Sequence, residues 1–207
     1  MNFELKGKAI FFATDNIQKF NEARKVLAEY KVAVGMLRAK ALEIQSDNLE
    51  EIAKTSVVDA FKRCNLPLIV EDAGLFTDVL NGFPGPYSAY VYKTIGNKGL
   101  LKLMENIENR KARFHSVIAY YSAELKSPIC FKGEALGEII KEERRGKRES
   151  GFGFDPIFKP ANSQKTFAEI TIMEKNKHSH RAKAMRRFGE WYKKSLWQKS
   201  QGDYSDQ

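Results

Sequence analysis

The feature that most constrains the fold is a short apolar run that stops at two adjacent carboxylates. Leu66 to Val70 is almost wholly apolar, and Glu71 and Asp72 follow it directly. Such a run is typical of a central strand covered on both faces, as in parallel sheets. Because open α/β sheets bind ligands beyond the carboxyl ends of their strands, the sequence predicts an α/β fold with both carboxylates at its ligand site. Successive residues of a strand point to opposite sides, so we expect the two to have different roles.

An alternative is that Glu71 and Asp72 only end the strand and begin a turn. The next loop favours a site instead, because Gly82 to Tyr87 (GFPGPY) is stiff, rich in turn residues and interspersed with aromatic rings. Loops of this kind on a rigid sheet often line pockets. The stretch therefore favours a pocket for a ring-bearing ligand.

A second apolar run, Lys8 to Thr14, precedes a polar turn and an amphipathic helix. Thr14 and Asn16 offer a hydroxyl and an amide at the helix N-terminus, where backbone N–H groups and the helix dipole favour anions, and Lys19 lies one turn inside. The pattern predicts a phosphate site, although Asp15 or Asn16 can also serve only as an N-cap. No G-x-x-x-x-G-K-[ST] motif occurs, which excludes a P-loop.

Apolar periodicity predicts the remaining elements. We expect strands at 32–40, 113–122, 129–132 and 135–140, and helices at 17–30, 49–65, 99–107 and 175–197. The charge-dense stretch 142–149 indicates a solvated hairpin or loop. His115 is interpreted as a packed or surface histidine, because no recognisable motif surrounds it.

Three further polar positions allow two readings each. Glu43 is a solvated charge at a strand end or, paired with Asp72 across a cleft, part of a two-carboxylate site with the hard oxygen ligands that Mg²⁺ prefers. Asp155 follows glycines and aromatic residues at 151–154; it either accepts hydrogen bonds from a flat ligand or belongs to a simple turn. The pair His180-Arg181 is either a cationic phosphate or base contact or an ordinary helix surface.

Size and charge narrow the class of protein. A chain of 207 residues suits one domain, or two lobes that share a sheet. Its net charge of +9 implies an anionic partner, either a nucleotide or a nucleic acid. No apolar run approaches the ~20 residues that cross a bilayer, and the N-terminus has no signal-peptide pattern, so we expect a cytoplasmic protein without a membrane partner. Cys64 and Cys130 are too few for a disulfide framework and are interpreted as small buried hydrophobes.

In their order along the chain, these motifs resemble the ITPase-like (Ham1) nucleoside triphosphate pyrophosphatases, also called XTP/dITP diphosphatases, from about Lys8 to Tyr192. The family motif T-G-N-x-x-K is similar to Thr14 to Lys19 (TDNIQK). The other matches are Glu43 in LEIQ, Lys54, Glu71-Asp72, GFPGPY at 82–87, FGFD at 152–155, TFAE at 166–169 and EKNKHSHR at 174–181.

The resemblance implies a role for each matched residue. Glu43 and Asp72 would bind Mg²⁺, and Asp72 would accept a proton. Glu71 stays open as the acceptor, because a carboxylate bonded to Mg²⁺ is a poor base. The substrate would be bound by Thr14, Asp15, Asn16, Lys19, Lys54, Ala73, Phe152, Gly153, Phe154, Asp155, Lys175, His180 and Arg181. Three of these depart from the family pattern: Asp15 replaces glycine or serine, Ala73 a frequent serine and Phe154 a frequent tyrosine.

For the whole chain, the resemblance implies a mixed α/β fold: a long twisted sheet flanked by helices, with two lobes and a nucleotide cleft between them. We expect one such domain over residues 1–199, a disordered tail at 200–207, and a homodimer. The implied activity is Mg²⁺-dependent conversion of ITP, dITP or XTP to the monophosphate and pyrophosphate, which cleanses the nucleotide pool.

Two other functions stay open. The net charge and the basic last helix, with Trp191, Tyr192 and Trp197, would suit a nucleic-acid-binding protein. The positive charge is dispersed and no recognised binding motif occurs, so we expect no nucleic-acid partner. A pyrophosphatase for modified pyrimidine triphosphates is the other alternative.

Overall fold

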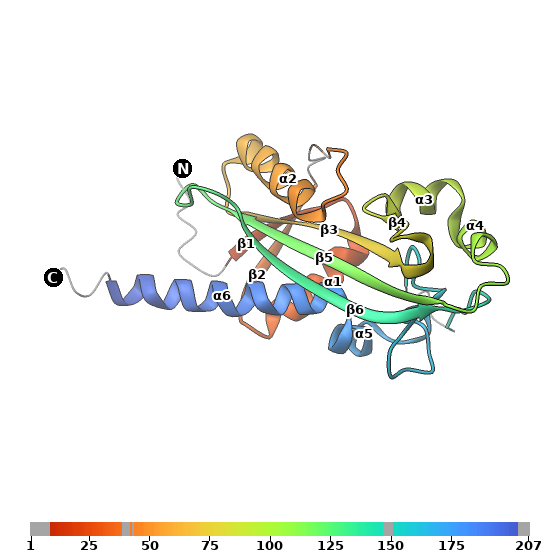
Figure 1. The fold of residues 1–207 in the computed structure, drawn as a ribbon. Coiled ribbons are helices and arrows are strands. Elements are labelled where there is room, and N and C mark those ends of the chain that lie inside the picture. Colours follow the sequence, from red (N-terminus) through yellow and green to blue (C-terminus); the bar gives the residue numbers. More distant parts are fainter. Residues whose placement is uncertain (1–8, 39–41, 43, 147–150, 203–207) are drawn as a thin grey trace.

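The computed structural model describes residues 9–38, 42, 44–146 and 151–202, with side chains through Ser195. A seven-stranded mixed sheet lies at its centre, in the order β2-β1-β3-β5-β6-β7 with β4 paired to β3 (Figure 1). The strands are β1 (Ala9–Ala13), β2 (Ala33–Leu37), β3 (Leu68–Thr77), β4 (Pro84–Gly85), β5 (Lys111–Tyr121), β6 (Ile129–Ile139) and β7 (Phe158–Pro160). Strand β1 is parallel to β2 and β3, and the other pairs are antiparallel. The predicted mixed α/β fold is confirmed.

Six α-helices flank the described part of the sheet. They are α1 (Ile17–Ala28), α2 (Leu49–Cys64), α3 (Ser88–Thr94), α4 (Gly96–Leu103), α5 (Ile172–His178) and α6 (His180–Gly202). In Figure 1, α2 covers one face of the sheet and α6 runs along the other. None of these helices is both long and apolar enough to cross a membrane.

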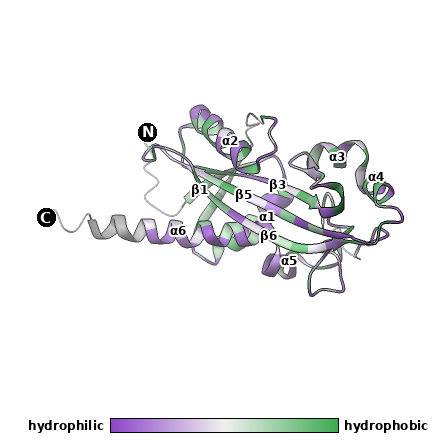
Figure 2. Ribbon diagram, in the orientation of Figure 1, coloured by the Kyte–Doolittle hydropathy of each residue, from purple (hydrophilic) through white to green (hydrophobic). Residues whose placement is uncertain are grey.

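The two faces of the sheet pack into different hydrophobic clusters. Ile69 and Ile118 pack in a cluster with α1 and α6, whereas Val70 and Val117 pack in a cluster with α2. A third cluster, which includes Phe114, joins the far ends of β5 and β6 to α4 and β7. Helix α6 packs on the sheet with one side only, and Figure 2 shows hydrophobic and hydrophilic residues alternating along it. Each sheet face is therefore a separate environment for the side chains of β3.

The prediction that the central strand ends at Glu71 is wrong. Strand β3 continues to Thr77, because β5 pairs with it along its whole length and sets Glu71 opposite Ile118 and Asp72 opposite Val117. The two carboxylates lie in mid-strand. Their predicted opposite orientation is confirmed, since Glu71 contacts Lys19 of α1 and Arg181 of α6, whereas Asp72 alternates with it and lies on the α2 face with Val70.

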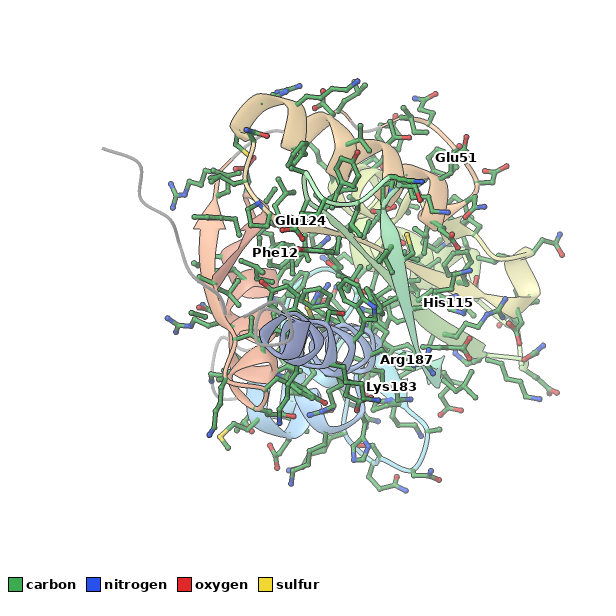
Figure 3. All side chains as sticks on the ribbon, turned by 90° about the vertical axis from the view of Figure 1, so that its left-hand side faces the viewer. Phe12, Glu51, His115, Glu124, Lys183 and Arg187 are labelled. Atoms are coloured by element: carbon green, nitrogen blue, oxygen red, sulfur yellow. The ribbon has the colours of Figure 1, made fainter. Side chains whose placement is uncertain are left out.

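The close packing of α6 explains a second difference. The expected break between strands at 129–132 and 135–140 is absent, and β6 runs through Gly133. A Cβ atom at Gly133 would lie 2.1 Å from the backbone oxygen of His180, so glycine here admits the helix rather than ending the strand. Farther along α6, Lys183 donates to the Glu134 carbonyl at 2.7 Å and Arg187 to a carbonyl of the same strand (Figure 3).

The last predicted helix is two helices. Ser179 is extended, with ψ 152°, and its Oγ accepts a hydrogen bond from Ala182 N, which ends α5 and starts α6. Helix α6 continues to Gly202, so residues 200–202 of the predicted tail are helical and the rest of that tail lies outside the described residues. Helix α3 was not predicted.

Smaller predictions have mixed outcomes. His115, predicted to be a packed or surface histidine, is half-buried with its ring against Phe76, and its Nε2 lies 2.6 Å from Glu134 Oε2. Cys64 and Cys130 are free thiols, but each is only half-buried. Residues 142–146 form an irregular loop, whereas 147–150 lie outside the described residues.

Candidate functional site

A cleft of about 740 Å³ opens between the β1–α1 turn, α2 and β3. Its walls are Ala13, Thr14, Asp15, Asn16 and Lys19 from the turn and α1; Ile52, Ala53, Ser56 and Arg63 from α2; Val70, Glu71 and Asp72 from β3; and Leu42 and Ala89. Three segments that the sequence singled out separately therefore meet in one cavity. Glu43, the predicted second metal ligand, lies outside the described residues.

The β1–α1 turn is held by its own side chains. Asn16 Oδ1 accepts hydrogen bonds from the backbone N–H groups of Gln18 and Lys19, both at 3.0 Å, and is the N-cap of α1. Thr14 Oγ1 accepts from Asn16 N at 3.1 Å. Both side chains thus order the turn and also border the cleft, beside the exposed Asp15.

Glu71 is the centre of a buried ionic contact behind the cleft. Its side chain is 0 % exposed; Lys19 Nζ lies 3.0 Å from Oε2, and Arg181 Nε lies 3.0 Å from Oε1. Ser116 Oγ donates to Oε1 at 2.8 Å. Burial raises the pKa of Glu71, but the charges of Arg181 and Lys19 outweigh it and hold that pKa well below its usual value. Glu71 is therefore a buried anion that orients two cations.

The same chain of ion pairs continues through a residue that the sequence analysis missed. Glu22 on α1 contacts Arg181 through Oε2 and Lys175 Nζ through Oε1 at 2.7 Å. Lys175 Nζ also lies 2.6 Å from Asp155 Oδ2. The helical spacing of Lys19, Glu22 and the buried positions 23 and 26 puts them on one stripe of α1, and a charge inside that apolar stripe was the available signal.

We call this chain the buried ion chain; its members, in order, are Lys19, Glu71, Arg181, Glu22, Lys175 and Asp155. It alternates in sign and contains three cations and three anions, so its charges balance. Burial without pairing would be costly for the five members other than Lys19, whose side chain is 22 % exposed, and the alternation supplies every member with at least one opposite charge.

His180 lies beside the buried ion chain without joining it. Its ring stacks on Phe114, with centroids 4.6 Å apart, and only 3 % of the residue is exposed. Burial, with a further contribution from Arg181, holds the pKa of His180 well below its usual value, so the ring is neutral at pH 7. Within the described part of the chain, Nδ1 has no hydrogen-bond partner.

The segment 152–155, which the family resemblance predicts to bind substrate, lies at the Asp155 end of the buried ion chain, beside Lys175. The Phe152 ring is 4.9 Å from Lys175 Nζ, and Asp155 Oδ2 accepts from Phe152 N at 2.9 Å. Gly153 has a positive φ of 59°. Phe154 is only 3 % exposed and packs edge-on against a tyrosine ring of α3, so its ring is part of the core.

Some predicted residues lie away from the cleft. Lys54 pairs with Glu50 at 2.6 Å and is not among the cleft-lining residues, whereas Ser56 is. Ala73 is half-buried on the same face of β3 as Glu71. The loop 82–87 was expected to line a pocket, but its residues Pro84 and Gly85 form β4 and pair with β3. The pairing is so close that a Cβ atom at Gly74 would lie 2.2 Å from the Gly85 oxygen.

Comparison with known proteins agrees with this geometry. The Ham1 family model matches residues 10–191. The dITP/XTP pyrophosphatase of Methanopyrus kandleri is 51 % identical over 90 % of this chain and 97 % of its own. The dITP/XTP pyrophosphatase of Thermococcus kodakarensis is 48 % identical over 89 % of this chain and 97 % of its own.

A solved structure is also similar. The Staphylococcus aureus Ham1 protein has a TM-score of 0.75 and 28 % identity, over 91 % of this chain and 100 % of that one. The match in sequence, over nearly the whole described length, and the match in fold confirm the resemblance. This chain belongs to the Ham1 family.

Proposed function

We propose that the protein hydrolyses non-canonical purine nucleoside triphosphates, such as dITP and XTP, to the monophosphate and pyrophosphate. The observation that carries this proposal is the meeting of the Thr14 to Lys19 turn with Asp72 in one cleft, backed by the buried cations Lys175 and Arg181. The names of the relatives, dITP/XTP pyrophosphatases, support the substrate class.

The phosphate chain would bind at the β1–α1 turn. Thr14 and Asn16 present polar side chains there, the dipole of α1 favours negative charge at this end, and Lys19 adds a cation whose position Glu71 fixes. Triphosphate binding would then rest on groups that are already ordered, which lowers the entropic cost of binding.

The donor set of the cleft fits Mg²⁺. Asp72 offers a carboxylate, and Thr14 offers a neutral hydroxyl oxygen in the same cavity. Mg²⁺ usually takes one or two carboxylates, substrate phosphates and water rather than a protein cage, which agrees with the absence of a cluster of three acidic, histidine or cysteine ligands among the described residues. Asp72, with Glu43 if the family role holds, would bind the ion. The chemistry that Mg²⁺ supplies when bound is neutralisation of charge on the phosphate oxygens.

We assign proton acceptance to Asp72 rather than Glu71, through the Asp72 carboxylate oxygen that would not bind Mg²⁺, because an oxygen bonded to the ion is a poor base. Water attacks the α-phosphorus, the bond to the α,β-bridging oxygen breaks, and the water's proton needs an acceptor at the cleft. Both Glu71 oxygens already face donors, and its lowered pKa makes it a weak base. Glu71 instead positions Lys19 and Arg181.

Base recognition is assigned to the far end of the buried ion chain. A 6-oxo purine such as hypoxanthine presents a carbonyl acceptor, which would suit the donors of Lys175 or Arg181 beside Phe152. A buried donor that loses its partner discriminates far more strongly than shape does, so adenine, with an amino group at that position, should be rejected.

The test is pyrophosphate and orthophosphate release from dITP, XTP, ITP, GTP, ATP and dTTP, with Mg²⁺ and with EDTA. Asp72→Asn should lower kcat at least about a hundredfold, as expected for loss of a catalytic carboxylate. Asp78→Asn is the matched control, because Asp78 pairs with Arg113 outside the cleft. Orthophosphate as product, or turnover that survives EDTA, would refute the mechanism.

Two remaining outcomes of the panel identify the alternatives. A preference for dTTP would move the substrate class to pyrimidines, and no turnover at all would direct attention to nucleic-acid binding measured in a salt titration. The homodimer that the family resemblance implies is likewise proposed; light scattering after size exclusion tests it.

A further inference from the structure

Leu42 at the rim of the cleft is held by helix α2 through both of its backbone groups. Its N–H donates to Asp59 Oδ2 at 2.9 Å, and its carbonyl accepts from Ser56 Oγ at 2.9 Å. Arg63 Nη2 lies 2.7 Å from the same Asp59 oxygen. The spacing of three and four residues puts Ser56, Asp59 and Arg63 on one side of α2, which we call the α2 polar stripe.

These polar groups are not needed to form the helix. Ser56 is only 6 % exposed and sits on the buried face of α2, where a serine usually bonds a carbonyl of its own helix. Here its hydroxyl reaches across to Leu42 instead. The hydrogen bond from Leu42 N holds the pKa of Asp59 below its usual value, so Asp59 is a carboxylate at pH 7.

Leu42 belongs to no helix or strand, and 53 % of the residue is exposed. It borders the cleft together with Ser56 and Arg63, and the same cleft is lined by the β1–α1 turn and Asp72. A backbone that is bound at both its donor and its acceptor cannot shift without losing two hydrogen bonds. The two hydrogen bonds therefore tie the wall of the cleft at this point to α2.

We propose that Ser56, Asp59 and Arg63 are positioning residues that fix the cleft wall at Leu42 and thereby set the affinity for the nucleotide. The inference rests on the proposed function, because it takes the cleft to be the nucleotide site. None of the three touches the reacting atoms in this role. Their effect is on KM and on the dissociation constant, and kcat stays within about twofold of wild type.

The experiment compares Asp59→Ala, Asp59→Asn and Ser56→Ala with the wild type. KM for dITP should rise about tenfold in Asp59→Ala, the factor for losing one hydrogen bond to a charged group, and about fivefold in Ser56→Ala. Asp59→Asn keeps an acceptor for Leu42 N and loses only the charge, so its KM should lie between wild type and Asp59→Ala. Glu105→Gln, which removes an exposed ion pair with Lys102 on α4, is the control and should leave KM unchanged.

A role limited to helix stability predicts a different pattern. Both Asp59 variants lose the pair with Arg63, so they would lower the melting temperature equally and leave KM unchanged. That result would overturn the proposal, and so would a fall in kcat at unchanged KM.

Calorimetric binding of the α,β-methylene analogue of dITP separates this inference from the proposed function. If the wild type binds the analogue but releases no pyrophosphate from dITP, the proposed function fails and the positioning role is judged by binding alone. Weaker binding by Asp59→Ala, in the order given for KM, supports the role. Equal binding by wild type and all three variants refutes it.

Discussion

Replacing Glu22 by glutamine tests the buried ion chain most directly. The side chain is about 4 % exposed and lies between Lys175 and Arg181, each of which keeps one other anion after the substitution. Three cations would then face two anions inside the protein. Breaking a buried pair on one side typically costs 3–5 kcal/mol, and the surviving partners favour the lower end, so we expect a loss of about 3 kcal/mol.

For a chain of 207 residues, each kcal/mol shifts the melting temperature by roughly 2–4 °C, so Glu22→Gln should melt about 6–12 °C below wild type. Calorimetry and urea denaturation measure the loss independently. Glu29→Gln is the matched control: Glu29 flanks the same helix and also pairs with an arginine of α6, but its side chain is 47 % exposed. An exposed pair of this kind contributes about 0–1 kcal/mol.

The stability difference between wild type and Glu22→Gln should depend on pH in a predictable direction. Burial raises the pKa of Glu22, but the charges of Lys175 and Arg181 lower it by more than burial raises it, so the folded pKa lies below the ordinary value of 4.5. A group with a lowered folded pKa stabilises above its unfolded pKa and loses that contribution as pH falls through the folded one. The wild type's advantage over Glu22→Gln should therefore be full at pH 7 and shrink below pH 4.5. A melting temperature within about 2 °C of wild type at pH 7 would refute the assignment of Glu22 as a stabilising anion.

Two further predictions concern other parts of the molecule. Gly189→Ala should destabilise by about 1–3 kcal/mol in urea, because the new Cβ would lie 2.6 Å from the Tyr30 ring; a gain in stability, as alanine's helix propensity alone would give, would contradict the packing. Hydrogen bonds from Lys132 and Lys54 lower the pKa of Glu50 to about 2, so wild type should lose stability relative to Glu50→Gln as pH falls from 4.5 towards 2. A carboxyl titration by NMR with a midpoint near 4.5 would argue against that pairing.

Helices that are marked by an N-cap and an apolar stripe in the sequence were predicted correctly. The helix starting at Ile17 follows from an N-cap and an apolar stripe, and α2 follows from the same rules at Asn48. The end of β3 could not be predicted in this way. The charges of Glu71 and Asp72 suggested that the strand ends there, but pairing with β5 extends it; Ser116 of β5, which bonds Glu71, is 45 residues away in sequence. Long-range pairing overrode a local polarity signal.

The candidate site divides in the same way. Residues in compact motifs, such as Thr14, Asn16 and Lys19, could be named from sequence. Glu22 had only the weak signal of a charge inside the apolar stripe of α1, and its role could not be named because that role depends on contact with Lys175, 153 positions later in the sequence. The α2 polar stripe was missed for a related reason: its hydrogen bonds go to a loop backbone, which leaves no trace in side-chain periodicity.

The alternation of charge in the buried ion chain also limits how this protein can change over generations. Replacing any one of the five fully buried members by a neutral residue leaves an unbalanced charge in the interior, whereas simultaneous replacement of two neighbours by apolar residues of similar volume can be neutral or stabilising. The members come from α1, β3, α5, α6 and the loop before β7, so such compensating changes must arise in distant parts of the gene. The chain of ions should therefore be inherited as a unit, even where the surrounding apolar core drifts freely.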